Sequence, residues 1–254
     1  MERQKITLLN GDCFEIMAKM PNKSIDLVVT DPPYLHNTSR SGGGHSKLAT
    51  SEMYKKSGMV MDKMSSFTPD CCKKMLNELD RILKKFDGYF FCNERLVGTY
   101  CAWAEEHKYL VNILTWNKPL SVLNRMRYST NIEYIVRIHT ASGTALNQLD
   151  TKNNPSLAQF YSKYQSVPRP TGKEKIHPTQ KPVELLKCYI LLSSKEDGIV
   201  FDPFMGSCST GAACIETNRR FVGIEIDKNI FDLAEKRIFE IKERVAENEQ
   251  ITFV

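Results

Sequence analysis

The segment Asp31-Pro32-Pro33-Tyr34 joins a carboxylate, two rigid backbone positions and an aromatic ring at the end of the apolar run 25–29. The prolines fix their own φ angles and keep the preceding residue out of the helical region, so the chain leaves the run in one extended direction. The carboxylate of Asp31 and the carbonyl of Pro32 can then accept the two N–H protons of an exocyclic amino group. Tyr34 supplies a flat surface on which a base can stack.

A base amino group needs such acceptors because its lone pair is delocalised into the ring, which makes the nitrogen a weak nucleophile. Acceptors on both protons favour a more tetrahedral nitrogen and stabilise the positive charge that develops as it attacks a methyl sulfonium. The transfer is then a positioned in-line displacement that requires no covalent enzyme intermediate. A turn that merely ends a strand is the alternative interpretation, but the place of Asp31 after a run rich in Val and Ile favours catalysis.

The second motif, Asp202-Pro203-Phe204-Met205-Gly206-Ser207, leads to Gly211 between an apolar run and a helical segment. Glycine-rich turns of this kind let a ligand approach the backbone. Glu225 follows 19 residues after Gly206, at the end of the next apolar run. An acid at this spacing is placed to accept hydrogen bonds from ribose hydroxyls. A purely structural strand–helix–strand unit remains the alternative, but turn, spacing and acid together favour a cofactor site.

Hydrophobic periodicity and turn residues predict an alternation of strands and helices along one domain, 1–254. The predicted strands are 6–9, 25–29, 88–92, 110–116, 132–138, 199–201 and 221–226, and the predicted helices are 13–20, 69–85, 96–107, 183–193, 210–217 and 229–247. This alternation predicts an α/β fold with a mostly parallel, doubly wound sheet. Residues 36–66 read as a flexible loop and residues 139–176 as an irregular insertion, because neither has a clear period.

Composition is that of a globular protein, with 41% hydrophobic and 26% charged residues and a net charge of +5. No apolar run is long enough to cross a bilayer and the N-terminus lacks a signal-like apolar segment, so we expect a cytoplasmic protein without a membrane partner. The 8 cysteines show no C-x-x-C spacing and the 5 histidines do not cluster. These patterns predict reduced thiols and no metal site.

Basic residues gather in two segments, 117–128 and 163–181. They are Lys118, Arg125, Arg127, Lys163, Arg169, Lys173, Lys175 and Lys181. Such a basic band would suit the phosphate backbone of a nucleic acid, although a solvated surface explains it equally well.

The two motifs, in this order, resemble the β-group S-adenosylmethionine-dependent DNA amino-methyltransferases of bacterial and phage modification systems. In that group the Asp-Pro-Pro-Tyr element comes first and the Phe-x-Gly cofactor motif lies near the C-terminus, and the likeness extends from residue 8 to about residue 240. The resemblance implies a Rossmann-like methyltransferase fold, S-adenosyl-L-methionine as cofactor and double-stranded DNA as partner. It also implies that the strand ending at Asp202 lies beside the strand ending at Asp31, and that the target base is flipped out of the duplex.

Site residues follow from the same resemblance. Asp31, Pro32, Pro33 and Tyr34 would be catalytic. In the segment 177–182, Thr179 and Lys181 would help to hold the methionine end of the cofactor, whereas Asp12 and Cys13 would contact its adenine ring. The segment 131–135 would line the pocket of the target base. The full set of expected cofactor residues is Asp12, Cys13, Thr179, Lys181, Asp202, Phe204, Gly206, Ser207, Glu225 and Ile226.

One position departs from the family pattern, because Cys208 stands where a second glycine is usual. If this position requires a positive φ, a cysteine there is strained. A tilted turn could instead bring the thiol close to the cofactor.

Adenine N6 is the favoured target, because cytosine-N4 enzymes more often carry Ser at the position of Asp31. A cytosine-N4 methyltransferase and a catalytically silent DNA-binding module that senses S-adenosylmethionine are the alternatives. Segments 36–66 and 139–176 would recognise DNA, and since both are short we expect a compact target site, a homodimer or a partner subunit. No nuclease signature accompanies the motifs, which favours an orphan or separate-subunit modification enzyme in a bacterial or phage-infected cell.

Overall fold

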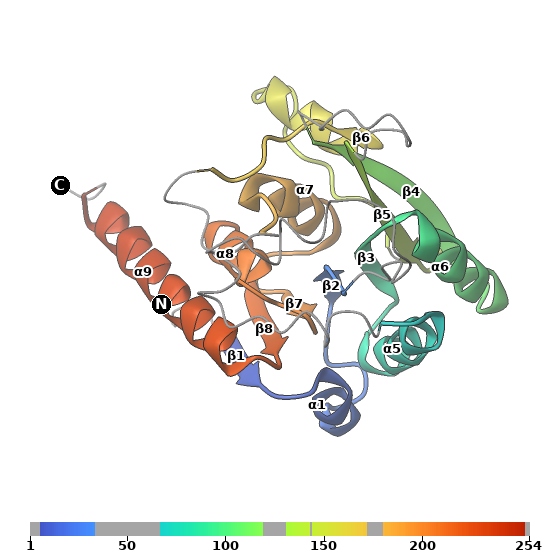
Figure 1. The fold of residues 1–254 in the computed structure, drawn as a ribbon. Helices are drawn as coiled ribbons and strands as arrows, with labels where there is room; N and C mark the ends of the chain where they lie inside the picture. Colours follow the sequence, from blue (N-terminus) through green and yellow to red (C-terminus); the bar gives the residue numbers. More distant parts are fainter. Residues whose placement is uncertain (1–5, 34–66, 119–130, 143, 172–179, 252–254) are drawn as a thin grey trace, which may run out of the picture.

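The computed structural model describes residues 6–33, 67–118, 131–142, 144–171 and 180–251 (Figure 1). Its strands are β1 (Ile6–Asn10), β2 (Leu27–Thr30), β3 (Asp87–Cys92), β4 (Leu110–Asn117), β5 (Ile132–His139), β6 (Tyr164–Gln165), β7 (Ile199–Asp202) and β8 (Arg220–Glu225). Its helices are α1 (Cys13–Lys19), α5 (Pro69–Ile82), α6 (Glu94–Glu106), the 3₁₀ helix η1 (Pro155–Tyr161), α7 (Val183–Ser193), α8 (Ser209–Glu216) and α9 (Lys228–Ile251). All the predicted strands and helices are present, with ends that differ by a few residues.

The described strands form one eight-stranded sheet in the order β1-β8-β7-β2-β3-β5-β4-β6. The five strands from β1 to β3 in this order are parallel to one another, and only β5 runs antiparallel to its neighbours β3 and β4. The prediction of a mostly parallel α/β sheet is therefore confirmed.

Helices cover both faces of the sheet, with α7, α8 and α9 on one side and α1, α5 and α6 on the other (Figure 1). Successive side chains of a strand point to opposite faces, so one strand feeds both cores. Val29 and Phe91 pack in the core beneath α7 and α8, whereas their neighbours Val28 and Phe90 pack in the core beneath α5 and α6. Strands buried on both faces explain the continuous apolar runs in the sequence.

The described part of the insertion 139–176 contributes an edge to the sheet. Its short strand β6 pairs in parallel with β4, and the indole of Trp116 donates a hydrogen bond to the carbonyl of Val167 at 2.8 Å. The sequence did not predict this pairing, because two residues are too few to show an alternating pattern. The predicted loop 36–66 lies outside the described residues.

All eight cysteines lie in described segments, and all are free thiols. No cluster of His, Cys, Asp and Glu side chains that could hold a metal ion occurs in the described part of the chain. Within the same residues, none of the helices combines the length and the apolar character that a membrane span would need.

A buried ion pair ties the antiparallel strand β5 to β3. Arg137 donates through Nε and Nη2 to the two carboxylate oxygens of Asp87, at 2.9 and 2.8 Å, and also donates to the carbonyl of Thr144 at 2.8 Å. Both charged side chains are almost fully buried. The bidentate geometry satisfies two charges that the interior would otherwise disfavour.

We expect Arg137→Met to lower the free energy of unfolding by about 3–5 kcal/mol, because it leaves the Asp87 carboxylate buried without a cation. Urea denaturation measures the effect. The double variant D87N/R137M removes both charges and should recover part of the loss. A single variant within about 1 kcal/mol of wild type would show that the pair does not hold the two strands together.

Candidate active site

The two chemical motifs meet at the carboxyl edge of the sheet. Strands β2 and β7 are parallel neighbours, with Val28 aligned to Phe201, so the chain leaves both at the same edge. The hydroxyl of Thr30, the residue before Asp31, donates a hydrogen bond to Asp202 Oδ1 at 2.7 Å. The expectation that two segments so distant in sequence converge is confirmed.

Asp202 holds this junction together from inside. Its second oxygen accepts a hydrogen bond from the Thr210 hydroxyl at 2.8 Å, and Oδ1 also accepts from the amide of Phe204 at 3.1 Å. Burial raises the pKa of Asp202 to about 6, although the hydrogen bonds that it accepts favour the ionised form. Asp202, predicted to bind cofactor, therefore uses both carboxylate oxygens to fasten the turn to β2 and α8.

Glu225 links the glycine turn to the ends of β8 and β1. Its Oε2 accepts from the amide of Gly206 at 3.1 Å and its Oε1 accepts from the amide of Asp227 at 2.8 Å, while its carbonyl accepts from the amide of Gly11 at 3.0 Å. Burial raises the pKa of the Glu225 carboxyl group. Gly206 has a φ of +49°, a left-handed conformation that glycine adopts without strain. Thus the predicted acid and the predicted turn are in direct contact.

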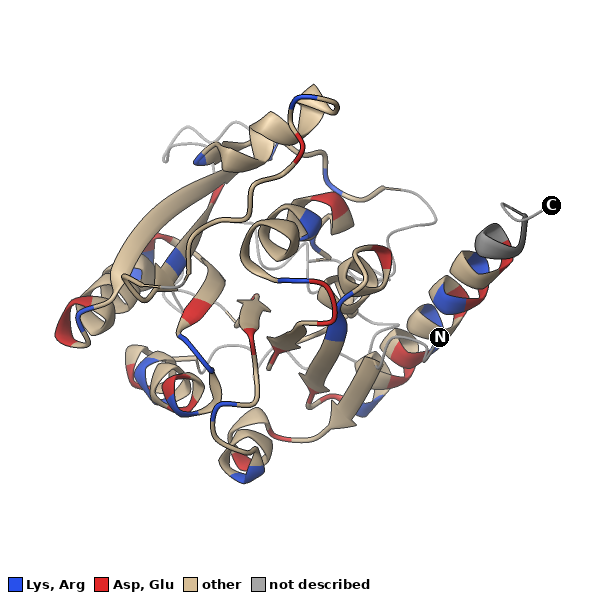
Figure 2. Cartoon of the chain, turned by 180° about the vertical axis from the view of Figure 1, so that it is seen from behind, with Lys and Arg blue, Asp and Glu red and all other residues tan. Residues whose placement is uncertain are grey.

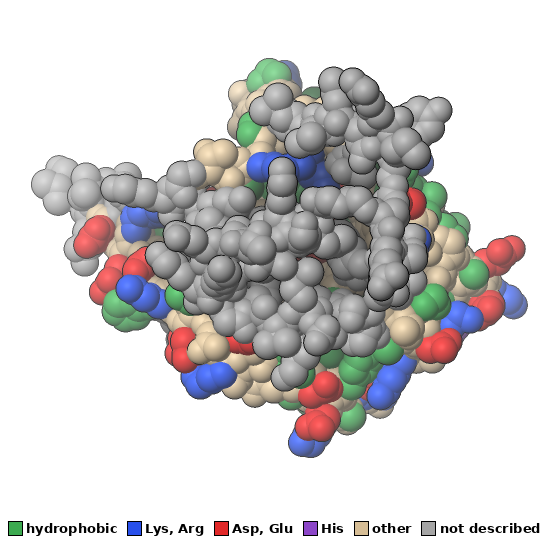
Figure 3. Space-filling view, viewed as in Figure 1, with side chains coloured by type: hydrophobic (Ala, Val, Ile, Leu, Met, Phe, Trp, Pro, Cys, Tyr) green, Lys and Arg blue, Asp and Glu red, His purple; other side chains and the backbone are tan. Residues whose placement is uncertain are grey.

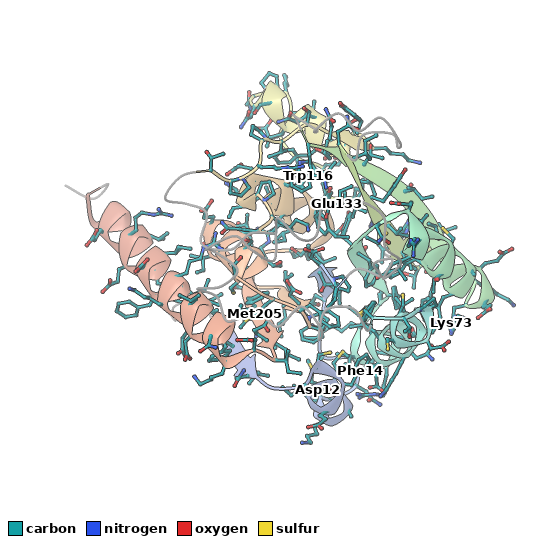
Figure 4. The ribbon with its side chains drawn as sticks, viewed as in Figure 1. Asp12, Phe14, Lys73, Trp116, Glu133 and Met205 are labelled. Carbon is teal, nitrogen blue, oxygen red and sulfur yellow. The ribbon has the colours of Figure 1, made fainter. Side chains whose placement is uncertain are left out.

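Two other expected cofactor residues, Asp12 and Ile226, directly follow Gly11 and Glu225 in the chain. Asp12 caps α1, because its Oδ1 accepts from the amides of Phe14 and Glu15 at 2.8 and 3.2 Å. Figure 4 shows Asp12 beside α1 and Met205 over the β7–β8 half of the sheet. Ile226 is 59% exposed and presents an apolar surface directly after Glu225.

Three further expected residues are buried or partly buried. The thiol of Cys13 is buried at the start of α1, and burial raises its pKa to about 12. The ring of Phe204 packs edge to face on Phe67, with 5.4 Å between centroids, and Ser207 is buried. Tyr34 and Thr179, also expected at the site, lie outside the described residues.

Cys208 has a φ of 59° and a ψ of 39°, so the position does require the left-handed conformation that glycine adopts in the family pattern. The side chain is fully buried, and burial raises the pKa of its thiol to about 12. Its Sγ occupies the space above Gly211, where an added Cβ would lie 2.4 Å from the sulfur. The thiol therefore packs into the core of the turn.

A residue that the sequence did not single out also supports the turn. Arg237 of α9 donates through Nη1 to the carbonyl of Ser207 at 2.7 Å and to the hydroxyl of Ser209 at 3.1 Å. Charges of both signs alternate along α9 (Figure 2), so no local signal distinguishes this arginine from its solvated neighbours.

Asp31 contacts a lysine that was expected at the cofactor. The ammonium of Lys181 binds Asp31 Oδ2 on one side and Glu133 Oε1, at 2.7 Å, on the other. The second oxygen of Glu133 binds Lys118 Nζ at 2.8 Å. Burial opposes the charged form of Glu133, but the two lysines outweigh it and lower the pKa of Glu133 to about 2. Sequence reasoning placed residues 131–135 near the target base but did not predict this row of charges.

These contacts concern two members of the basic band. Lys118 and Lys181 are ion-paired within the protein, so their charges are not directed at a phosphate backbone. Figure 3 shows positively and negatively charged side chains of the described residues interspersed around the edge of the molecule in that view. The arginines and lysines at 125, 127, 173 and 175 lie outside the described residues.

Comparison with known proteins decides the family. The DNA methylase family model matches residues 25–236, most of the chain. The chain belongs to the DNA methylase family. It is a DNA methyltransferase that uses S-adenosyl-L-methionine, as the two motifs predicted.

Two relatives and two solved structures illustrate the similarity. The chain is 32% identical to the type II methyltransferase M.HinfI of Haemophilus influenzae, over 93% of this chain and 69% of the relative. It is 26% identical to the DNA adenine methyltransferase YhdJ of Escherichia coli (strain K12), over 91% and 82% of the two chains. The M1.HpyAVI–SAM complex shares the fold with a TM-score of 0.63 and 24% identity, over 92% and 98% of the chains. PvuII DNA methyltransferase, cytosine-N4-specific, shares it with a TM-score of 0.68 and 16% identity, over 96% and 95%.

The buried carboxyl group of Asp202 should make the stability of this methyltransferase depend on pH. Its pKa is about 6 in the fold against an ordinary value of 3.8, so the native state binds this proton more tightly than the unfolded chain does. The protonated form of Asp202 therefore stabilises the fold by on the order of 3 kcal/mol. This stabilisation is fully present below about pH 4 and is lost as the pH rises through about 6. Because D202N lacks this ionisation, its unfolding free energy relative to wild type should improve over that range. If urea denaturation gave the same change in unfolding free energy with pH for wild type and D202N, the assignment of this pKa to Asp202 would be wrong.

The contact between Cys208 and Gly211 gives a second test. We expect Gly211→Ala to lower the free energy of unfolding by about 1–3 kcal/mol, because the new Cβ overlaps the sulfur and the ring of Phe221. The double variant C208G/G211A removes the sulfur and should be more stable than G211A alone. Strictly additive effects in a denaturation cycle would mean that the two side chains do not compete for this space.

Proposed function

We propose that this enzyme methylates the N6 amino group of adenine in double-stranded DNA. The Thr30–Asp202 hydrogen bond is the observation that carries the proposal, because it fixes the end of β2, with Asp31 and Pro32, against the turn that begins at Asp202. A methyl donor bound over that turn would face a nitrogen held at Asp31. Such proximity is what an in-line displacement requires.

Residues of the chain suit both the activation of the amino group and the binding of the flipped base. The carboxylate of Asp31 and the carbonyl of Pro32 accept the amino protons and stabilise the developing positive charge. Because a stacked base cannot reach this position, the target must be flipped out of the duplex, with Tyr34 as its stacking partner.

We further propose that S-adenosyl-L-methionine lies over the ends of β1, β7 and β8. The turn at Gly206 lets it approach the backbone, and Glu225 and Ile226 would receive its ribose and adenine. The exposure of Ile226 and the contact between Glu225 and Gly206 support this placement.

Adenine is favoured over cytosine by the acid at position 31 and by the adenine methyltransferase among the relatives, whereas the cytosine-N4 enzyme is similar in fold alone. DNA recognition is assigned to segments 36–66 and 139–176. A second copy of the chain or a partner subunit would complete the recognition surface, because both segments are short.

Transfer of a labelled methyl group to duplex DNA, followed by nucleoside chromatography, tests the target base. We expect the label in N6-methyladenine. Label in N4-methylcytosine would make the adenine assignment wrong, and unlabelled DNA with intact cofactor binding would favour the silent DNA-binding module.

Asp31→Ala should reduce the methyl-transfer rate by a factor on the order of 100 to 1,000, because the amino group loses its charged acceptor. Cofactor affinity, measured by calorimetry, should change little. Asp232→Ala is a matched control, since Asp232 is an exposed aspartate of α9 that also pairs with a lysine, Lys228, and belongs to none of the proposed catalytic, cofactor or DNA-recognition segments. Equal rates for D31A and D232A would rule out the proposed role of Asp31.

A further inference from the structure

Four side chains of alternating charge extend from the proposed target position into the protein. This charge row consists of Asp31, Lys181, Glu133 and Lys118, each in contact with the next. Three distant segments supply it: the end of β2, the residues before α7, and the β4–β5 hairpin, where Trp116 is aligned with Glu133. Figure 4 shows Glu133 and Trp116 close to each other at that hairpin.

The two inner side chains of the row are the most buried. The exposed fraction of the side chain is 25% for Asp31 and 17% for Lys118 at the two ends, but 8% for Lys181 and 7% for Glu133 between them. The ammonium of Lys181 also lies 5.1 Å from the centre of the Phe91 ring. Charges in such surroundings interact more strongly than they do in water, so the sign of each one affects the next.

Lys181 by itself would oppose the reaction. The target nitrogen becomes positive during transfer, and Asp31 favours that change through its negative charge. An ammonium bound directly to Asp31 cancels that charge and places a cation near the same nitrogen. A second carboxylate on the far side of Lys181 neutralises this cation and restores the negative field of Asp31.

We propose that Glu133 is a positioning residue for methyl transfer, which acts through Lys181 to keep the negative charge of Asp31 effective at the target nitrogen. This inference rests on the function proposed above. Burial opposes the charged form of Lys181, but Asp31 and Glu133 outweigh it and raise its pKa, so the row is ionised at neutral pH.

Glu133→Gln tests the proposal, because it removes the charge and keeps an oxygen that can accept from Lys181. The readout is the single-turnover rate of methyl transfer at saturating DNA and S-adenosyl-L-methionine. We expect a fall of at least about tenfold, with the cofactor dissociation constant within about twofold of wild type. A rate within about twofold of wild type would overturn the proposal.

The matched control is Glu216→Gln. Lys187 bridges Glu184 and Glu216 at 2.9 and 3.1 Å, so the control breaks the same kind of lysine–carboxylate bridge away from the charge row. Its rate should equal that of wild type. A comparable loss in E216Q would show that the effect on rate is one of general stability, and would contradict the proposal.

Two more variants distinguish a rate loss caused by the missing charge from one caused by weaker support of the β4–β5 hairpin. In E133Q/K181M no uncompensated cation remains beside Asp31, so its rate should exceed that of E133Q, and a slower double variant would contradict the proposal. Lys118→Gln breaks the Glu133–Lys118 bridge but leaves Glu133 beside Lys181, so it should lose much less rate than E133Q. If K118Q and E133Q lost equal methyl-transfer rate and showed equal falls in melting temperature, Glu133 would only support the structure of the hairpin and the proposal would be wrong.

The activities of wild type and of E133Q distinguish a failure of this inference from a failure of the proposed function. If wild-type enzyme binds S-adenosyl-L-methionine but methylates no DNA, the proposed function fails before any variant is compared. If wild type is active and E133Q is equally active, only the role assigned to Glu133 fails.

Discussion

The parallel pairing of β2 with β7 is the constraint on which the rest of this methyltransferase depends. Parallel neighbours bring their carboxyl ends to one edge of the sheet, so residues far apart in sequence become adjacent there. The Thr30–Asp202 hydrogen bond closes this junction, and Asp202 in turn holds the glycine turn. Without that pairing, Asp31 and Glu225 would belong to unrelated parts of the molecule.

Burial gives the charges at this edge their different functions. Asp202 is buried and hydrogen-bonded within the protein, so it holds the turn, β2 and α8 together. Asp31, by contrast, is partly exposed at the outer end of the charge row. Lys181 and Glu133 are buried next to it and balance each other. The low polarity of the interior makes the buried charges of Lys181 and Glu133 tolerable because each lies beside an opposite charge. The same requirement removes Lys118 and Lys181 from the basic surface that composition suggests.

Local backbone strain appears in the turn between β7 and α8. Cys208 adopts a left-handed conformation that costs a residue with a side chain more than it costs glycine, and its sulfur fills the space above Gly211. The glycine at 211 and the cysteine at 208 thus form one packing unit. Arg237 binds the carbonyl of Ser207 from α9 and adds a long-range support to the same turn.

Local periodicity, proline and glycine geometry and fixed spacing were sufficient to predict the order of strands and helices and the two motifs, and the order of the motifs predicted the family. The patterns in the sequence place Asp31 and Glu225 at strand ends and Gly206 in the turn that follows a strand. Four contacts are visible only in the folded protein: Lys181 binds Asp31, Glu133 lies between two lysines, Arg237 binds the turn, and β6 joins the sheet. Each of these contacts joins residues whose separation in sequence carries no pattern, so it becomes defined only when the packed layers fix the distances between them.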